Sequence, residues 1–147
     1  MTERKKRIHR CCVTGHRPER LSIPESKVKA ALQKEIRLAI ADGINVFITG
    51  MAPGVDIWAA EIILELREKE NLPLKLIAAC PHHGFENRWS LEWQKRYAVI
   101  MAKADFIKDV CTHYSRGCYQ IRNEWRVDHS VRVIAVWNGS PSGTKTP

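Results

Sequence analysis

The 147-residue sequence lacks the features of a membrane-spanning or secreted protein. No apolar run approaches the length needed to cross a bilayer, and the start "MTERKKRIHR" lacks the long apolar stretch and cleavage site of a signal peptide. The five cysteines include no CxxC pair, and their odd number favours reduced thiols over a disulfide framework. We therefore expect a cytoplasmic protein with no membrane partner.

Internal repeats, low-complexity tracts and the common phosphate-binding motifs are also absent. Neither GxGxxG nor GxxxxGK[ST] occurs. The apolar share of 44% is enough for one core, which argues against disorder. We expect a basic N-terminal arm over residues 1–9 and a single domain over residues 10–147.

Acidic residues are scarce in the first quarter of the chain. Residues 1–37 hold 11 Lys and Arg against 4 Asp and Glu, whereas the remainder holds 13 against 12. A basic segment of this kind attracts polyanions, so nucleic acid is one candidate partner for residues 1–37. A solvated arm followed by a charged helix face explains the same pattern.

Short apolar runs alternate with longer amphipathic ones along the chain. The runs predict strands over 10–15, 45–50, 74–80, 105–111 and 132–139. The amphipathic segments predict helices over 25–43, 55–70, 86–104 and 118–130, and the tail 140–147 has no periodicity. This alternation predicts an α/β fold: a Rossmann-like three-layer sandwich of about five mostly parallel strands with helices on both faces.

Such sheets bind ligands at the carboxyl ends of their strands, where this sequence places glycine-rich loops. "TGHRP" (14–18) follows the first strand, "TGMAPGVD" (49–56) follows the second, and "SGT" (142–144) lies in the tail. Backbone N–H groups and a helix N-terminus can bind phosphate there, with Arg17 and Arg88 as bidentate partners and Asp56 on a ribose hydroxyl. The alternative is that these glycines only form turns and helix caps.

Two further groups of residues bear on catalysis and metal binding. Glu124 near the start of the fourth helix is the candidate catalytic carboxylate, and charge compensation at a helix start explains it equally well. Cys80, His82 and His83 lie close together but lack a second ligand cluster at zinc spacing, so we expect no metal. Trp89 and Trp93 are the tryptophans expected near a ligand.

Three segments together resemble a known family: "CCVTGHRPERL", "FITGMAPGVDIWAAE" and "NEWRVDHSVRVIAVWNGSPSGT". They are similar to the YpsA-like family of the SLOG superfamily, which also contains DprA and the LOG phosphoribohydrolases. The resemblance covers nearly the whole chain and implies a Rossmann-like sheet, a nucleotide-type ligand and no established enzyme activity. The pocket that it implies comprises Gly15, His16, Arg17, Gly50, Gly54, Asp56, Asn123, Glu124, Asp128, Gly143 and Thr144.

The sequence departs from this pattern at its end. Members of the family usually continue past a final "GGT" into a closing helix, whereas this chain has "PSGT" and ends at Pro147, so we expect that helix to be missing. An apolar patch left there would favour a homo-oligomer. The LOG motif "PGGxGTxxE" corresponds to "NGSPSGTKTP", which lacks the glutamate.

Three functions follow from the sequence. The first is binding or sensing of a nucleotide or nucleotide-derived small molecule. The second is a phosphoribohydrolase-type reaction, in which Glu124 or Asp128 would be the carboxylate. The third is single-stranded DNA binding of the DprA type, which must weaken steeply with salt.

Overall fold

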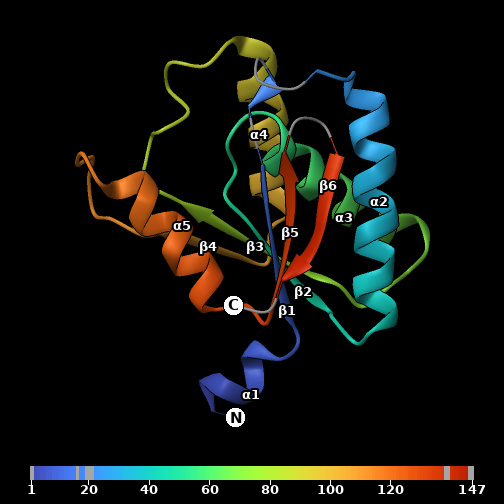
Figure 1. The fold of residues 1–147 in the computed structure, drawn as a ribbon. Coiled ribbons are helices and arrows are strands. Elements are labelled where there is room, and N and C mark those ends of the chain that lie inside the picture. The colour runs from blue at the N-terminus through green and yellow to red at the C-terminus, as the bar shows by residue number, and fades with distance from the viewer. Residues whose placement is uncertain (1, 16, 19–21, 138–139, 146–147) are drawn as a thin grey trace.

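The computed structural model describes residues 2–15, 17–18, 22–137 and 140–145, with the backbone alone at Trp137 and over 140–145 (Figure 1). The strands are β1 (Arg10–Gly15), β2 (Val46–Thr49), β3 (Lys75–Cys80), β4 (Phe106–Asp109), β5 (Arg132–Trp137) and β6 (Ser140–Lys145). The helices are α1 (Glu3–Arg7), α2 (Glu25–Ala41), α3 (Val55–Lys69), α4 (Leu91–Lys103) and α5 (Cys118–Asp128).

One sheet holds the six strands in the order β4-β3-β2-β1-β5-β6. The first five are parallel to their neighbours, and β6 is antiparallel to β5. From β1 to β4 the chain moves steadily to one edge of the sheet, and it then returns through α5 to place β5 on the other side of β1. The strand order therefore reverses between β1 and β5, which confirms the predicted Rossmann-like fold.

The two faces of the sheet are covered unequally. The main core contains Leu32 of α2, Ile63 of α3, Ile100 of α4 and the inward side chains Phe47 and Leu76 of the sheet. The opposite face has a much smaller core. It consists of Cys12, Ile48 and Ala79 with partly buried side chains that include Trp125 and Val127 of α5. One face thus carries α2, α3 and α4, while α5 covers part of the other.

The helix boundaries follow local capping. In α4 the Ser90 hydroxyl accepts the backbone N–H of Trp93 at 3.4 Å, which marks the start of the helix. The prediction that this helix begins at residue 86 was therefore wrong, because residues 86–89 form turns. Among the described residues no helix is both long and apolar enough to cross a membrane.

The two ends of the chain contain elements that the periodicity did not predict. The tail 140–147 has no periodicity, and no element was predicted there, but Ser140–Lys145 form β6, in which Ser140 pairs with Trp137 and Lys145 with Val133. The basic N-terminal arm includes α1, capped by the Thr2 hydroxyl. The tail is short and polar, so it has no apolar alternation that would predict a strand. It forms one because its backbone pairs with β5.

Candidate functional site

The glycine loops after β1 and β2 shape the carboxyl edge of the sheet. A Cβ on Gly15 would lie 2.8 Å from the Val55 side chain and 2.9 Å from the Val136 carbonyl oxygen, so only glycine fits there. After β2, Met51 and Gly54 both have positive φ, 63° and 96°. This sharp corner brings the N-terminus of α3 to the strand end, where no side chain caps it.

Two arginines one turn apart on α5 point from the helix into this corner. Arg122 is 4% exposed and Arg126 is 3% exposed. The Arg126 guanidinium donates to the Val13 carbonyl at 3.2 Å and to the Thr14 hydroxyl at 2.6 Å. Arg122 donates to the Gly50 carbonyl. The pair therefore ties α5 to the ends of β1 and β2.

The buried charges of this cluster do not balance. Asp56 forms a salt bridge of 3.2 Å with Arg126 through one oxygen and accepts the Ala52 N–H at 3.3 Å with the other. No carboxylate of the described residues forms a salt bridge with Arg122, and Arg126 Nε is buried with no hydrogen-bond partner in the part of the chain that is described. Burial, and then the neighbouring Arg126, lower the pKa of Arg122 to about 10. Among the described residues, the site therefore holds an excess of positive charge.

Gly50 lies directly against the charged ends of Arg122, Arg126 and Asp56. A Cβ at this position would lie 2.3 Å from Nη1 of Arg126, 2.6 Å from Oδ2 of Asp56 and 2.8 Å from Nη1 of Arg122. A side chain at this position would require the buried ends of these three side chains to move. The Gly50–Gly54 loop is thus more than a turn, because the backbone at Gly50 lies directly against both guanidinium groups.

An aromatic cavity of about 640 Å³ opens beside the cluster. The described residues that line it are Arg17, His82, Gly84, Phe85, Asn87, Arg88, Trp89, Tyr114 and Tyr119. Its rings meet edge to face, with centroids 4.9 Å apart for Phe85 and Trp89 and 5.5 Å apart for His82 and Tyr114. The Arg122 guanidinium lies 5.8 Å from the Tyr119 ring centroid, so Tyr119 connects the cavity to the arginine cluster.

The residues predicted for the site fall into three groups. Gly50, Asp56 and Asn123 meet in the arginine cluster, where Asn123 accepts a hydrogen bond of 2.8 Å from Arg122. Gly15 and Gly54 shape the loops, while Arg17 and Arg88 line the cavity with Trp89. Trp93 instead packs on Trp58, with ring centroids 6.3 Å apart.

The remaining predicted residues lie elsewhere. Glu124 is exposed and accepts a hydrogen bond of 3.2 Å from Gln120, and Asp128 is exposed at the end of α5. Gly143 and Thr144 belong to β6 rather than to a loop, with Thr144 paired to Ile134. His16 lies outside the described residues. Their contact with a ligand stays a prediction.

Arg122, Arg126 and Tyr119 were absent from the predicted site. The sequence feature that could have indicated them is the spacing of Arg122 and Arg126, which puts both on one face of α5. Arginine on a helix is ordinarily exposed, so nothing in the sequence placed this face of α5 against the sheet.

The described residues contain no group of three His, Cys, Asp or Glu side chains that could hold a metal ion. Cys80, one of the residues considered for that role, lies 3.7 Å from the Tyr97 hydroxyl. Burial raises the pKa of the Cys80 thiol to about 12, which disfavours the thiolate that a metal requires.

The strand order and the glycine loops at the carboxyl edge define a Rossmann-like α/β protein. The model of the YspA SLOG family, also written YpsA, matches residues 11–146. The chain belongs to that family.

Similar proteins agree with this assignment. A UPF0398 protein of Oceanobacillus iheyensis is 31% identical over 142 residues, which cover 90% of this chain and 76% of the relative. A UPF0398 protein of Bacillus pumilus is 32% identical, with 90% and 75% covered. The X-ray structure of DNA processing protein A (DprA) from Streptococcus pneumoniae matches with a TM-score of 0.57 and 16% identity. That match covers 87% of this chain but 41% of DprA, so it supports the fold alone.

Proposed function

We propose that this protein binds a nucleotide or nucleotide-derived small molecule, with a phosphate group beside Arg122 and the Gly50–Gly54 loop. The observation that carries the proposal is the charge imbalance: within the described part of the chain, two buried guanidinium groups share one carboxylate, Asp56. An unpaired buried charge is costly, and proteins ordinarily pair it or give it a ligand of opposite sign. A phosphate dianion would supply the missing negative charge.

The surrounding backbone favours an anion as well. Helix α3 begins at Gly54 with no side-chain cap, so its first N–H groups and its dipole can act on a ligand at the loop. Arginine also offers paired donors that match a phosphate. The predicted ribose contact of Asp56 is less favoured, because both of its oxygens have protein partners. We therefore propose that Asp56 positions the Arg126 guanidinium rather than contacting a ribose.

The aromatic cavity suits the base of such a ligand. Its volume of about 640 Å³ lies within the range of small-molecule sites. Phe85, Trp89, Tyr114 and Tyr119 offer ring faces and edges to a planar heterocycle. The described lining contains Arg17 and Arg88 but no Asp or Glu, so a ligand that carries further phosphate groups meets no like charge there.

Binding is favoured over glycosidic bond cleavage by the positions of the carboxylates. Cleavage needs a carboxyl group at the reacting carbon. Glu124 is exposed and bonded to Gln120, and Asp56 is held by Arg126. Neither geometry presents a free carboxylate to the aromatic cavity.

A thermal-shift panel tests the proposal and its alternatives together. We expect AMP, ADP-ribose or NAD to raise the unfolding midpoint of the protein by several degrees at a saturating concentration, and adenosine to have little effect. Equal shifts with adenosine and AMP would contradict the proposed phosphate site. A shift with a single-stranded oligonucleotide alone, lost at high salt, would favour nucleic-acid binding instead. Release of free base from AMP would favour the phosphoribohydrolase-type reaction.

A further inference from the structure

A second cavity, of about 520 Å³, lies at the opposite edge of the sheet from the glycine loops. Its walls come from the beginnings of the parallel strands, including Arg10 of β1, Val46 of β2 and Phe106 next to Asp105 at β4. Parallel strands start at one edge and end at the other, so this cavity is separated from the arginine cluster by the length of the strands. The proposed nucleotide site does not involve it.

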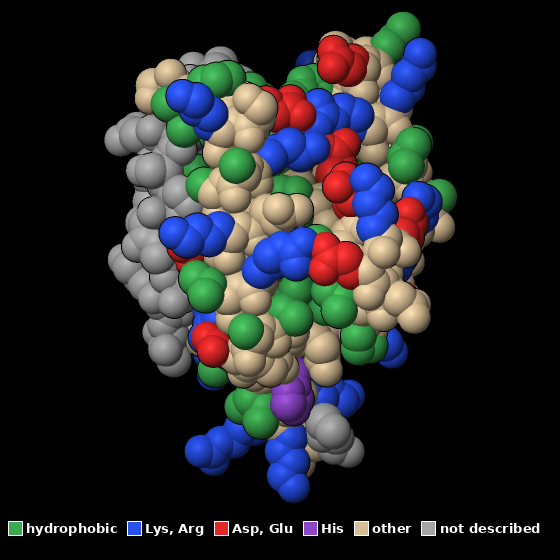
Figure 2. Space-filling model, turned by 90° about the vertical axis from the view of Figure 1, so that its right-hand side faces the viewer, with side chains coloured by type: hydrophobic (Ala, Val, Ile, Leu, Met, Phe, Trp, Pro, Cys, Tyr) green, Lys and Arg blue, Asp and Glu red, His purple; other side chains and the backbone are tan. Residues whose placement is uncertain are grey.

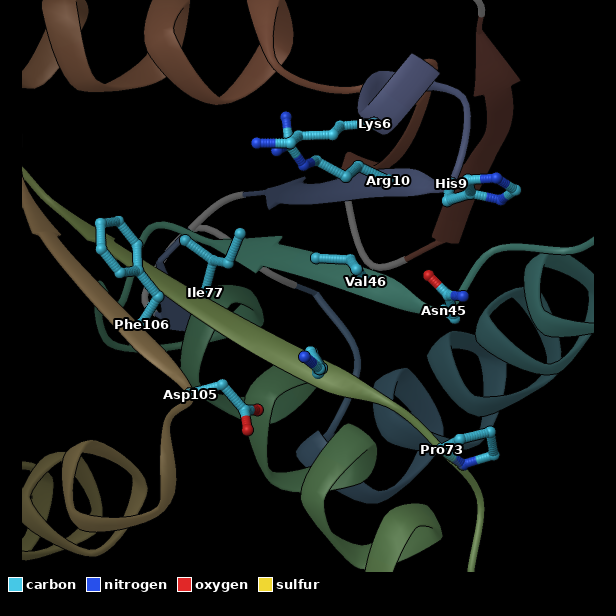
Figure 3. A pocket seen from close by; sticks show the side chains of 10 residues that line it. Lys6, His9, Arg10, Asn45, Val46, Pro73, Ile77, Asp105 and Phe106 are labelled. Carbon is cyan, nitrogen blue, oxygen red and sulfur yellow. The ribbon is translucent and has the colours of Figure 1, made fainter. Parts of the chain in front are cut away.

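The floor of this cavity is a strip of apolar side chains on three neighbouring strands. Figure 3 shows Val46, Ile77 and Phe106 following one another across β2, β3 and β4. Ile77 pairs directly with Phe106, which is 53% exposed. These side chains lie on the same sheet face as Ile48 and Ala79, the face that α5 covers in part. Parallel sheets are normally covered on both faces, so this strip is a place for another element.

Cations surround the strip. Val46 is flanked in register by Arg10 on β1 and Lys75 on β3, and Lys6 of α1 overlies the same cavity. Lys6 and Lys75 form no salt bridge with any carboxylate of the described residues. Arg10 is paired with Glu3 at 2.5 Å. Two ammonium groups are therefore available at the rim.

The acidic residue of the cavity is already neutralised. Asp105 accepts a hydrogen bond of 2.7 Å from Arg67 and one of 2.8 Å from the backbone N–H of Leu76. Its negative charge is thus paired with Arg67, and it forms no salt bridge with Lys6 or Lys75. The cavity thus presents an apolar floor with a net positive rim.

Helix α1 strengthens this positive character. Its last turn carries Arg4, Lys5, Lys6 and Arg7, and none of its residues is buried. Figure 2 shows Lys and Arg side chains extending from the lower end of the molecule, where α1 lies, whereas positive and negative side chains are mixed over the body above. A partner that approaches this end meets a cationic field.

We propose that this cavity docks an acidic amphipathic helix of another protein. Three adjacent strands span about 10 Å at a spacing of about 4.8 Å, which matches the diameter of a helix of about 10–12 Å. The apolar face of the helix packs on Val46, Ile77 and Phe106, and its carboxylates pair with Lys6 and Lys75. A second copy of this chain that docked through the same face would bring the same cations to the interface, which disfavours pairing of this face with itself. The proposed partner is a different protein.

The composition of the floor distinguishes a peptide from nucleic acid. Nucleic acid binds through phosphates and stacks its bases on aromatic rings. Here two of the three floor side chains, Val46 and Ile77, are aliphatic, which suits the leucine-rich face of a helix.

Fluorescence anisotropy with designed probes tests this docking site. The probes are a labelled helical peptide with a leucine face and glutamate flanks, the same peptide with lysine flanks, and a labelled single-stranded oligonucleotide. We expect the acidic peptide to bind, and Lys75→Glu and Phe106→Ser each to weaken it at least tenfold. Lys34→Glu, the same charge change at an exposed position of α2, should leave binding unchanged.

Several results would overturn the inference. They are no binding of the acidic peptide, equal binding of the lysine-flanked peptide, and acidic-peptide binding that survives Lys75→Glu. Binding of the oligonucleotide alone, weakened by Lys75→Glu, would assign the surface to nucleic acid. Circular dichroism of Phe106→Ser, a change at an exposed side chain, checks that the variant is folded.

Discussion

The guanidinium of Arg126 and the carboxylate of Asp56 lie 3.2 Å apart, and both residues are at most 4% exposed. Because Arg122 is buried beside them without a carboxylate partner among the described residues, Asp56 supplies the negative charge of this cluster. The carboxylate lies on the first turn of α3, and the guanidinium lies on α5. This one pair joins elements from the two faces of the sheet.

Asp56→Asn should destabilise the protein by about 3–5 kcal/mol, because it leaves two buried guanidinium groups with no carboxylate partner among the described residues. Urea denaturation measures the loss in the free energy of unfolding. Sulfate should restore part of it by binding between the arginines. Glu65→Gln is the matched control: Glu65 is exposed on the same helix and bridges Lys69 one turn away, so the change should cost about 0.5 kcal/mol. Equal losses of unfolding free energy for the two variants would show that Asp56 does not compensate the buried arginines.

Arg122→Met should have little effect on the stability of the ligand-free protein, within about 1 kcal/mol. The variant loses the hydrogen bond to Gly50 but also removes an unpaired buried charge, and these effects oppose each other. Urea denaturation without added anions measures the difference. A loss above about 3 kcal/mol would mean that Arg122 is already compensated within the protein and needs no anion.

Gly50→Ala should lower stability by about 1–3 kcal/mol and abolish AMP binding, because its Cβ would lie 2.3 Å from a buried guanidinium nitrogen. Gly117→Ala provides a control at a glycine with no atom within 4 Å of the added Cβ and no positive φ. Thermal unfolding and titration with AMP should distinguish the two variants. Unchanged AMP affinity in Gly50→Ala would remove the Gly50–Gly54 loop from the site.

The ion network of Glu61 should make stability depend on acid pH. Burial disfavours its ionised form, but hydrogen bonds from Arg96 and Lys29 outweigh burial and lower the pKa of Glu61 below 4.5. A depressed carboxylate pKa contributes stability above the unfolded value, and that contribution is lost as pH falls through the folded value. We expect Glu61→Gln to cost about 1 kcal/mol at pH 7.

Urea denaturation of the wild-type protein and Glu61→Gln at pH 7 and pH 3 measures this effect. The difference in unfolding free energy between the wild type and Glu61→Gln should be smaller at pH 3 than at pH 7, because Glu61 is becoming protonated in the wild type. If this difference in unfolding free energy is the same at pH 7 and pH 3, then packing, rather than charge, accounts for the destabilisation by Glu61→Gln.

Much of the fold could be predicted from the sequence because apolar periodicity reports burial directly. Val28, Leu32 and Ile36 recur every four residues and form the buried face of α2. The five parallel strands were found for the same reason. Strand β6 was missed because "SPSGTK" carries no apolar alternation, and its pairing with β5 depends on a neighbour that is defined only in the folded chain.

The site could be predicted only where glycines mark it. Gly15, Gly50 and Gly54 indicated the carboxyl edge, since glycine is placed where backbone must approach closely. The buried arginines could not be found in the same way, because burial of Arg122 and Arg126 depends on which face of α5 meets the sheet. Glu124 directly follows Asn123 in the sequence, but it lies on the exposed side of α5.

Our main proposal is that the excess positive charge at Arg122 binds phosphate. Isothermal titration of AMP and of adenosine, against the wild-type protein and Arg122→Met, tests it most directly. We predict that the wild type binds AMP at least tenfold more tightly than adenosine, and that Arg122→Met loses this preference while Lys34→Met keeps it. An AMP preference that persists in Arg122→Met, or a wild type that binds both ligands equally, would contradict the claim.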